Sequence, residues 1–429
     1  MKHSGIPWIG EIPKEWSIGK LKHFYRFITG FTPDSKNESF YDESGMPWVT
    51  ISDMNGKFVT GTKNGISSNY ISIKNPTIVP SNSLLYSFKL SVGQVARTKF
   101  DVYTNEAIAS FLPSDNISLD YLFYSSQVCI IENANENIYG AKLLNQDLIN
   151  NATIIFPPLP EQQKIASFLD KKCSEIDEMV VLQEKIIEEL KAYKQSVITE
   201  AVTKGLNPDV PMKDSGIEWI GEIPESWEMY RIKYNAFLKG RIGWQGLNSS
   251  DFIEEGYCLI TGTDFDNKGG VNWDTCYRIS KERFDEDELL HVKDGDLLMT
   301  KDGTVGKMAY IKKMPEEASL NSHLLIIRQT TNIINNEFLY WVMLSTVFKR
   351  FCSIYQSGSI MNSISQSTLG LFSCYCPSYD EQCEIISYLN TKCTEIDTLI
   401  SIKQSKIESL KEYKKSIIYE YVTGKKEVI

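Results

Sequence analysis

The sequence predicts an α+β fold in which two β-rich domains alternate with two long helices, and the helices pair as an antiparallel coiled coil. Three observations support this prediction. A motif that starts at residue 4 recurs at residue 215, a helical segment that starts at residue 161 recurs at residue 381, and short β-type runs fill the stretches between them. Because an internal repeat signals a repeated structural unit, we also expect internal pseudo-two-fold symmetry.

Each half of the chain opens with the same motif. Residues 4–16 read SGIPWIGEIPKEW and residues 215–227 read SGIEWIGEIPESW, an offset of 215 − 4 = 211. The length of 429 residues suits about two or three domains. The repeat therefore predicts four consecutive segments: a first β-rich domain at 1–158, a first helix at 159–206, a second β-rich domain at 207–378 and a second helix at 379–429.

The repeated segments 161–205 and 381–425 are predicted to be helices that pair with each other. Both lack Pro and are rich in good helix formers, and their apolar residues recur with near-heptad spacing at an offset of 381 − 161 = 220. Each helix of about 40 residues is ~60 Å long at about 1.5 Å per residue. A narrow apolar stripe needs a partner, and since a domain separates the two copies, they are expected to pair antiparallel. The pair either only joins the domains or also fixes the distance between them. The predicted interface comprises Ile165, Leu169, Ile176, Val180, Ile187, Leu190, Ile385, Leu389, Ile396, Ile400, Ile407 and Leu410.

The segments between the helices read as β-rich with inserted helices. Strand-like runs lie at 48–51, 83–86, 296–299 and 324–327, and Asn-Gly and Asp-Gly turn signals separate such runs. Helical stretches are expected near 118–132 and 335–352. Two unlike β-rich domains on repeated helices suggest one scaffold with two different reading surfaces.

One strand–turn–glycine pattern recurs in both β-rich domains. It reads LLYSFKLSVGQVAR at 84–97 and LLMTKDGTVGKMAY at 297–310, with Gly93 and Gly306 aligned. Glycine here permits close approach to another strand or to a phosphate, although an ordinary hairpin with solvent-facing lysines is the simpler explanation of the pattern by itself. Two small-residue loops, at 139–142 and 357–360, precede the last strand of each domain, and their amide and hydroxyl side chains suit either base edges or plain turns. The candidate DNA contacts are Lys89, Arg97, Lys142, Asn145, Arg241, Lys301, Lys307, Ser359 and Asn362.

Charge and missing motifs restrict the function. A net charge of −10 argues against a chain that grips nucleic acid alone, because phosphate contacts need a basic footprint. The sequence has no HExxH zinc motif, no Walker A motif and no methyltransferase tetrad, so we expect no catalytic, cofactor-binding or metal-binding residues. It also has no secretion signal and no apolar run near the ~18 residues that a membrane span needs. We therefore expect a cytoplasmic protein without a membrane partner.

The repeated motifs resemble those of the specificity subunit of type I restriction–modification systems. The resemblance rests on the two IGEIPxxW openings, on PLPEQQKIASFLD at the start of the first helix, and on the LKxYKxSxIxExVT pattern near the end of each helix. It covers essentially the whole chain. The second helix starts differently, with CPSYDEQCEIISYLN, but keeps Pro377, Glu381, Gln382, Ile385 and Leu389.

The resemblance implies a non-catalytic, DNA-reading role within a larger complex. Each β-rich domain would be a target-recognition domain that reads one half of a bipartite double-stranded DNA site, and the helix pair would set the spacer. Two methyltransferase subunits would dock on the helices, bring S-adenosylmethionine and flip an adenine for N6 methylation. Two ATP- and Mg-dependent restriction subunits would cut unmodified DNA. The alternatives are a self-contained DNA methyltransferase with its own recognition domain and a scaffold with two binding domains and no DNA role.

Overall fold

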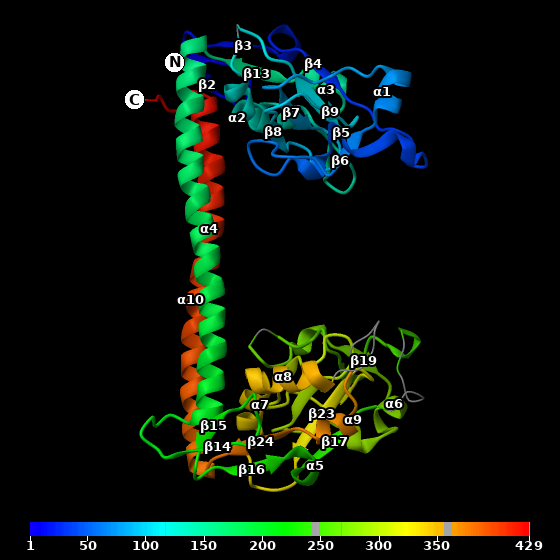
Figure 1. The fold of residues 1–429 in the computed structure, drawn as a ribbon, viewed down its shortest axis with the longest axis vertical. Helices are drawn as coiled ribbons and strands as arrows, with labels where there is room; N and C mark the ends of the chain where they lie inside the picture. The colour runs from blue at the N-terminus through cyan, green and yellow to red at the C-terminus, as the bar shows by residue number, and fades with distance from the viewer. Residues whose placement is uncertain (116, 242–246, 248, 267, 356–362, 429) are drawn as a thin grey trace. The chain divides into compact units, whose positions relative to one another are not determined.

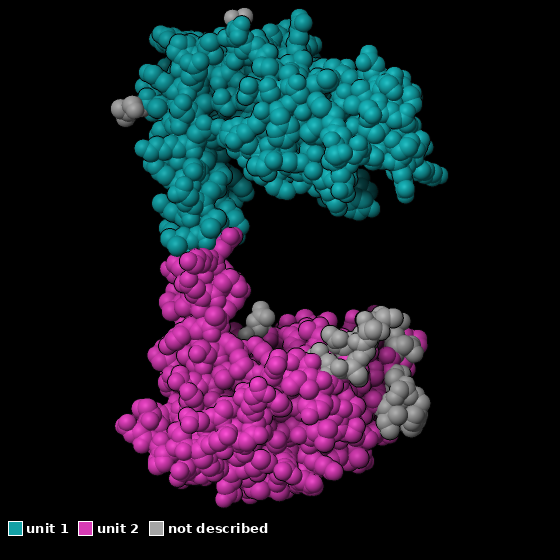
Figure 2. Space-filling model, viewed as in Figure 1, with its two compact units in different colours: residues 1–183, 405–429 teal, residues 184–404 magenta. Residues whose placement is uncertain are grey.

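The chain folds into two compact units. The computed structural model describes residues 1–429 except 116, 242–246, 248, 267, 356–362 and 429. Unit 1 comprises residues 1–183 and 405–429, and unit 2 comprises residues 184–404 (Figure 2). Each unit therefore combines one β-rich domain with half of each long helix, and the division between the units runs through the helices.

The two long helices are α4 (Leu159–Lys204) and α10 (Tyr379–Val422), and they pack side by side (Figure 1). In unit 1, Leu169 near the start of α4 shares an apolar core with Ile417 near the end of α10. In unit 2, Val197 near the end of α4 shares a core with Leu389 near the start of α10. The start of each helix thus lies beside the end of the other, which confirms the predicted antiparallel pair.

The repeated opening motif closes the ends of these helices. In unit 1, Trp16 is buried and donates its indole N–H to Glu161 in the first turn of α4, at 2.8 Å. Gly424, at φ +67° just after α10, packs so tightly that an added Cβ would lie 2.4 Å from Pro13. In unit 2, Trp227 makes the matching bond to Glu381 at 3.3 Å. The motif is therefore repeated because each end of the helix pair is closed in the same way.

The first β-rich domain is built on two sheets. One has the strand order β4-β10-β7-β8 and is antiparallel throughout, and the other has the order β6-β5-β9, in which β5 and β9 are parallel. Helix α2 packs against the first sheet. Bounds are β4 (Phe27–Thr29), β5 (Tyr41–Val49), β6 (Asn64–Ile66), β7 (Leu84–Ser87), β8 (Val95–Arg97), β9 (Tyr103–Thr104), β10 (Ile108–Phe111), α1 (Ser68–Lys74), α2 (Leu119–Cys129) and α3 (Gln146–Asn150).

The second β-rich domain repeats this topology. Its sheets have the orders β17-β23-β20-β21 and β19-β18-β22, with β18 and β22 parallel. Bounds are α5 (Ile232–Asn235), β17 (Ala236–Lys239), β18 (Tyr257–Ile260), β19 (Tyr277–Ile279), α6 (Lys281–Asp285), β20 (Leu297–Thr300), β21 (Met308–Tyr310), β22 (Ala318–Leu320), β23 (Leu324–Gln329), α7 (Asn336–Leu344), α8 (Thr346–Tyr355) and α9 (Gln366–Gly370). The two domains therefore share one fold, although their sequences have diverged.

Five short two-stranded pairs complete the described fold. They pair β1 with β2, β3 with β13, β11 with β12, β14 with β15 and β16 with β24. Bounds are β1 (Lys2–His3), β2 (Glu11–Ile12), β3 (Ser17–Lys20), β11 (Asn135–Glu136), β12 (Lys142–Leu143), β13 (Thr153–Phe156), β14 (Met212–Asp214), β15 (Glu222–Pro224), β16 (Glu228–Arg231) and β24 (Ser373–Cys376). Because β3–β13 and β16–β24 each pair the start of a domain with its end, they close the domain just before its long helix begins.

Candidate functional site

In unit 1, the predicted interface residues Ile165, Leu169 and Ile176 of α4 share an apolar core with Leu410 of α10. Nine of the twelve predicted residues are buried, and Val180, Leu190 and Ile400 are half-buried. The apolar stripe breaks at Lys194 and Lys414, and each of these lysines instead binds an aspartate of the other helix. The breaks in the stripe are thus filled by charge pairs rather than left empty.

The helices also expose apolar side chains at equivalent positions in the two units. Unit 1 carries Met179, Leu182 and Tyr413, and unit 2 carries their counterparts, which the offset of 220 identifies as Leu399, Ile402 and Tyr193. These side chains are between 45% and 56% exposed. The predicted helix interface did not include them, because they lie outside the near-heptad stripe. Their repetition in both helices was the available signal.

The aligned glycines occupy the same turn in both domains. Gly93 (φ +91°) and Gly306 (φ +87°) lie in the turns that join β7 to β8 and β20 to β21. Each donates its backbone N–H to the last residue of the preceding strand, at 2.9 Å to Ser87 and 3.0 Å to Thr300. A residue with a Cβ is strained at these φ angles, which is the physical reason for both glycines.

A second turn, which the sequence analysis missed, adjoins the glycine turn. The strand run predicted at 48–51 ends at Val49, because the carboxylate of Asp53 turns the chain by accepting from the N–H and hydroxyl of Thr50, at 2.8 and 2.7 Å. Asp264 does the same for Thr261 in unit 2, at 2.7 and 2.8 Å. The shared spacing Thr-x-Ser/Thr-Asp was the signal for this turn.

The structure ties this second turn to the glycine turn in both domains. Gln94 donates to the carbonyl of Met54 at 2.7 Å, and Lys307 donates to the carbonyl of Gly262 at 3.0 Å. The ammonium of Lys307, a predicted DNA contact, therefore joins the two turns.

Three of the other predicted contacts are exposed. Lys89 lies on the glycine turn, Lys142 pairs with Glu136 at 2.7 Å, and Asn145 caps α3 by accepting from the N–H of Leu148 at 2.8 Å. Lys301 is partly buried and pairs with its neighbour Asp302 at 2.7 Å. The predicted contacts Ser359 and Asn362 lie outside the described residues.

Arg97 is buried inside unit 1. Its guanidinium donates to Asp120 at the start of α2, at 2.5 Å, and to the carbonyl of Asn82 at 2.9 Å. Burial lowers the pKa of Arg97, while the nearby carboxylates of Asp120 and Asp170 act in the opposite direction. A guanidinium held in this way joins β8 to α2 and is not presented at the surface.

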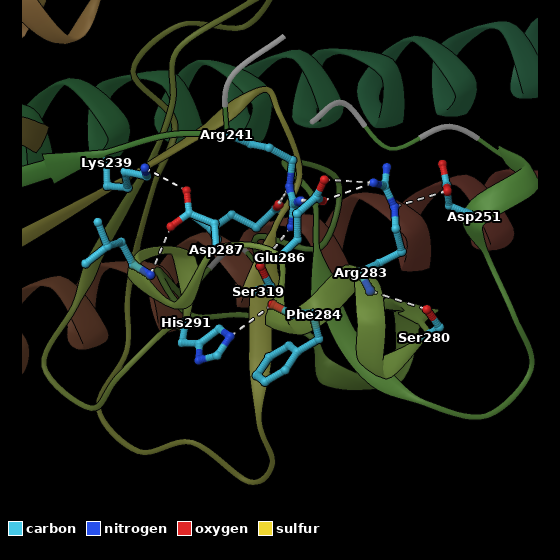
Figure 3. Close-up of polar contacts among 12 residues, drawn as sticks. Lys239, Arg241, Asp251, Ser280, Arg283, Phe284, Glu286, Asp287, His291 and Ser319 are labelled. Carbon is cyan, nitrogen blue, oxygen red and sulfur yellow. Dashed lines mark hydrogen bonds and ion pairs between the residues drawn. The ribbon is translucent and has the colours of Figure 1, made fainter. Parts of the chain in front are cut away.

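Arg241 is also buried, at the centre of an ionic cluster in unit 2 (Figure 3). It donates to the carbonyl of Leu320 at 3.0 Å, to the hydroxyl of Ser319 at 3.1 Å and to Glu286 at 3.1 Å. Glu286 also binds Arg283 at 3.0 Å. Burial lowers the pKa of Arg241, and the carboxylate of Glu286 acts in the opposite direction. The cluster fixes α6 against β22 from inside the domain.

The corresponding place in unit 1 is aromatic. Phe31 follows Gly30 at the end of β4, as Arg241 follows Gly240 at the end of β17. Phe31 stacks on Tyr70 of α1, with ring centroids 5.1 Å apart and an interplanar angle of 14°. The two domains thus share a topology but build this region from different chemistry.

Neither a metal-binding cluster nor a membrane-spanning helix is found among the described residues. No three His, Cys, Asp or Glu side chains in the described part of the chain gather as a metal site. Among the helices of the same part, none combines the length and the apolar character that crossing a membrane requires.

The fold and the site define a duplicated binding protein, with two domains of one topology and different interiors, each joined to its part of a helix pair. The family model for the type I restriction modification DNA specificity domain matches the chain twice, over residues 13–192 and 242–412. These matches cover most of the chain, which therefore belongs to this family, as the resemblance predicted.

Curated relatives and solved structures agree with this assignment. The chain is 25% identical to the type I restriction enzyme MjaVIII specificity subunit of Methanocaldococcus jannaschii, over 96% of this chain and 93% of that protein. It is 24% identical to the EcoKI specificity subunit of Escherichia coli (strain K12), over 77% and 71%.

Two solved structures share the fold. A chain from a structure on complex assembly and conformational transition of the type I R-M system aligns with a TM-score of 0.74 at 15% identity, over 96% of this chain and 98% of that one. The HsdS subunit from Thermoanaerobacter tengcongensis aligns with a TM-score of 0.50 at 15% identity and the same coverage. At such identities these likenesses speak for the fold alone, and they confirm the predicted α+β class.

Proposed function

We propose that this chain is the specificity subunit of a type I restriction–modification complex and that it reads a bipartite DNA target without catalysing a reaction itself. The observation that carries this proposal is the shared sheet topology of two domains whose interiors differ, aromatic at Phe31 and ionic at Arg241. Both halves match the model of a DNA specificity domain, so the shared topology is proposed to bind duplex DNA, and different interiors support different loops at its base edges. Each domain therefore reads its own half-site.

The helix pair sets the spacer between the half-sites. Helices α4 and α10 each pass from one unit to the other as continuous helices of 46 and 44 residues. A continuous helix transmits a fixed rise of about 1.5 Å per residue, so the number of residues between the domains limits how far apart the half-sites lie.

The equivalent apolar surfaces on the helices are docking sites for two copies of one partner. Exposed apolar side chains can mark interaction sites, and here each unit presents the same set once, with Leu182 in unit 1 and Ile402 in unit 2. Two methyltransferase subunits bind there and supply S-adenosylmethionine chemistry. Two restriction subunits, which use ATP and Mg²⁺, complete the complex in the cytoplasm. These partners also supply most of the phosphate contacts, since a chain of net charge −10 has no broad basic footprint of its own.

Replacing residues 17–155 with the equivalent segment of another specificity subunit tests the proposal. Adenine methylation mapped across the genome should show one changed half-site, one retained half-site and an unchanged spacer, because the second domain has its own core. Deletion of the gene should abolish the methylated target. The proposal fails if deletion removes no methylation, or if the swap changes both half-sites. Methyl transfer by the purified chain alone would favour the self-contained methyltransferase.

A further inference from the structure

The two β-rich domains share one exposed charged residue in an otherwise diverged stretch. Residues 84–100 align with residues 297–313 without a gap, at an offset of 297 − 84 = 213, and the bounds of β7 and β8 match those of β20 and β21 at this offset. Six positions are identical: Leu84/Leu297, Leu85/Leu298, Val92/Val305, Gly93/Gly306, Ala96/Ala309 and Lys99/Lys312. Lysine is the single charged residue among them.

The fold explains five of these identities. The two leucine positions and the alanine position are buried in both domains, and the valines pack against the domain cores. The glycines adopt positive φ. Lys99 and Lys312 lie two residues beyond strands β8 and β21, and both are exposed. Burial and backbone strain therefore give no reason for the repeated lysine.

Each of the two lysines has another lysine near it, and Lys312 also faces a carboxylate. The ammonium of Lys99 lies 4.4 Å from the ring centroid of Phe58, and that of Lys57 lies 5.7 Å from the same ring. Lys312 pairs with Glu337 at 3.3 Å with its side chain 68% exposed. It lines a hollow of about 760 Å³ in unit 2 together with Lys268, Lys313 and the acidic residues Asp266 and Asp397.

These contacts contribute little to folding. An exposed ion pair stabilises a protein by up to about 1 kcal/mol, and an exposed cation–π contact by a similar amount. Glu337 also has a second partner, since the side-chain amide of Asn390 donates to its carboxylate at 2.9 Å. Lys312 is therefore not the sole partner of Glu337, whose side chain is 17% exposed.

We infer that Lys99 and Lys312 contact backbone phosphates of the target DNA at equivalent places on the two domains. Phosphate contacts carry no sequence information, so domains that read different sequences can share them, whereas their base contacts must differ. The buried Arg97 and Arg241 are unsuited to this task, and Lys89 has Asp302 as its counterpart. This inference rests on the proposed DNA-reading function and adds the residues that anchor each domain.

Salt-dependent DNA binding tests the inference. The full chain, in complex with the methyltransferase subunit that copurifies with it, is titrated with a duplex carrying the target that methylation mapping identifies. Neutralising one phosphate contributes about 0.9 to the slope of log K against log salt. Lys99→Gln and Lys312→Gln should each reduce that slope by about 0.9 and weaken binding about fivefold at 0.15 M salt, and the double variant should lose about twice as much slope. The mapped half-site sequences should not change.

Matched variants separate the outcomes. Lys99→Arg and Lys312→Arg should keep the slope, and so should Lys74→Gln and Lys293→Gln, which alter exposed lysines elsewhere on each domain. The inference is overturned if both glutamine variants bind with the wild-type slope, or if either changes the methylated sequence. If instead the wild-type complex prefers no target over unrelated DNA, it is the proposed function that fails.

Discussion

Lys194 on α4 binds both carboxylate oxygens of Asp397 on α10, at 2.7 and 2.6 Å, within unit 2. Lys414 binds both oxygens of Asp177 at the same two distances within unit 1. The offsets are equal, since 397 − 177 = 220 and 414 − 194 = 220. Each repeat therefore contributes one aspartate and one lysine, and each charge meets its opposite on the other helix.

The Lys194–Asp397 ion pair should stabilise the contact between α4 and α10 modestly. Asp397→Lys places two ammonium groups opposite each other, so we expect the free energy of unfolding to fall by about 1 kcal/mol. The double variant Lys194→Asp/Asp397→Lys should recover most of this loss. Thermal unfolding at low salt measures the effect, and high salt should reduce it. Equal stability of the single and double variants would contradict a direct interaction.

The buried tryptophan of the opening motif should matter more than its exposed neighbour. Trp227→Phe removes the indole N–H that binds Glu381 and leaves space in a fully buried site. We expect unit 2 to lose about 1–3 kcal/mol of stability. Trp219 belongs to the same motif but is 39% exposed, so Trp219→Phe should have little effect. Hydrogen exchange of amides near the ends of the helices resolves the two variants, and similar exchange in both would argue against the closure.

Arg241 should act through folding rather than through DNA contact. Arg241→Met leaves the carboxylate of Glu286 without this buried partner, and breaking a buried ion pair costs about 3–5 kcal/mol. Limited proteolysis should show unit 2 opening first. Adding Glu286→Leu should recover part of the loss, and Lys281→Met, at an exposed pair, should change little. A stably folded Arg241→Met protein with a new half-site sequence would support a base contact instead.

The exposed apolar residues of the helices should control partner stoichiometry. Leu182→Lys should remove one methyltransferase subunit from the complex, Ile402→Lys should remove the other, and the double variant should bind neither, because each unit carries one equivalent surface. Light scattering of the purified complexes measures the mass. Lys185→Glu, which changes an exposed residue of the same helix, serves as the control. Unchanged mass in the double variant would place the partner elsewhere.

Shortening the helices should alter the tolerated spacer and nothing else in the target. Removing residues 183–189 and 403–409 takes out one heptad from each helix, so the apolar stripe continues in register on both sides. Methylation mapping should show either a shorter spacer or no methylation, with both half-sites intact. New half-site sequences in this variant would refute the spacer role of the helices.

The sequence predicted the parts of the fold that depend on local periodicity. The apolar stripe identified α4 and α10 and their antiparallel pairing, because one face of a helix recurs at a fixed spacing. The pairing of Gly93 with Gly306 identified a shared turn, since positive φ restricts the residue type. These features need no knowledge of distant neighbours.

The candidate contacts were less predictable because they depend on tertiary partners. Arg241 meets Glu286 and Ser319, which are 45 and 78 residues away, and nothing near Arg241 in the sequence marks it as buried. Arg97 finds Asp120 in the same way. The repeated Lys99 and Lys312 could have been noticed in the alignment, but only the structure shows that the other identities have structural causes.

The two equivalent Lys–Asp pairs between α4 and α10 have a consequence for assembly. A single repeat already contains both members of the interaction, Asp177 and Lys194, so two copies of that repeat have the complementary charges for an isologous contact in which each aspartate meets the other copy's lysine. The tandem arrangement makes this symmetric contact within one polypeptide. The two β-rich domains can therefore differ in sequence. A homodimer of half-length chains would be bound to a palindrome, whereas fusion into one chain permits an asymmetric site.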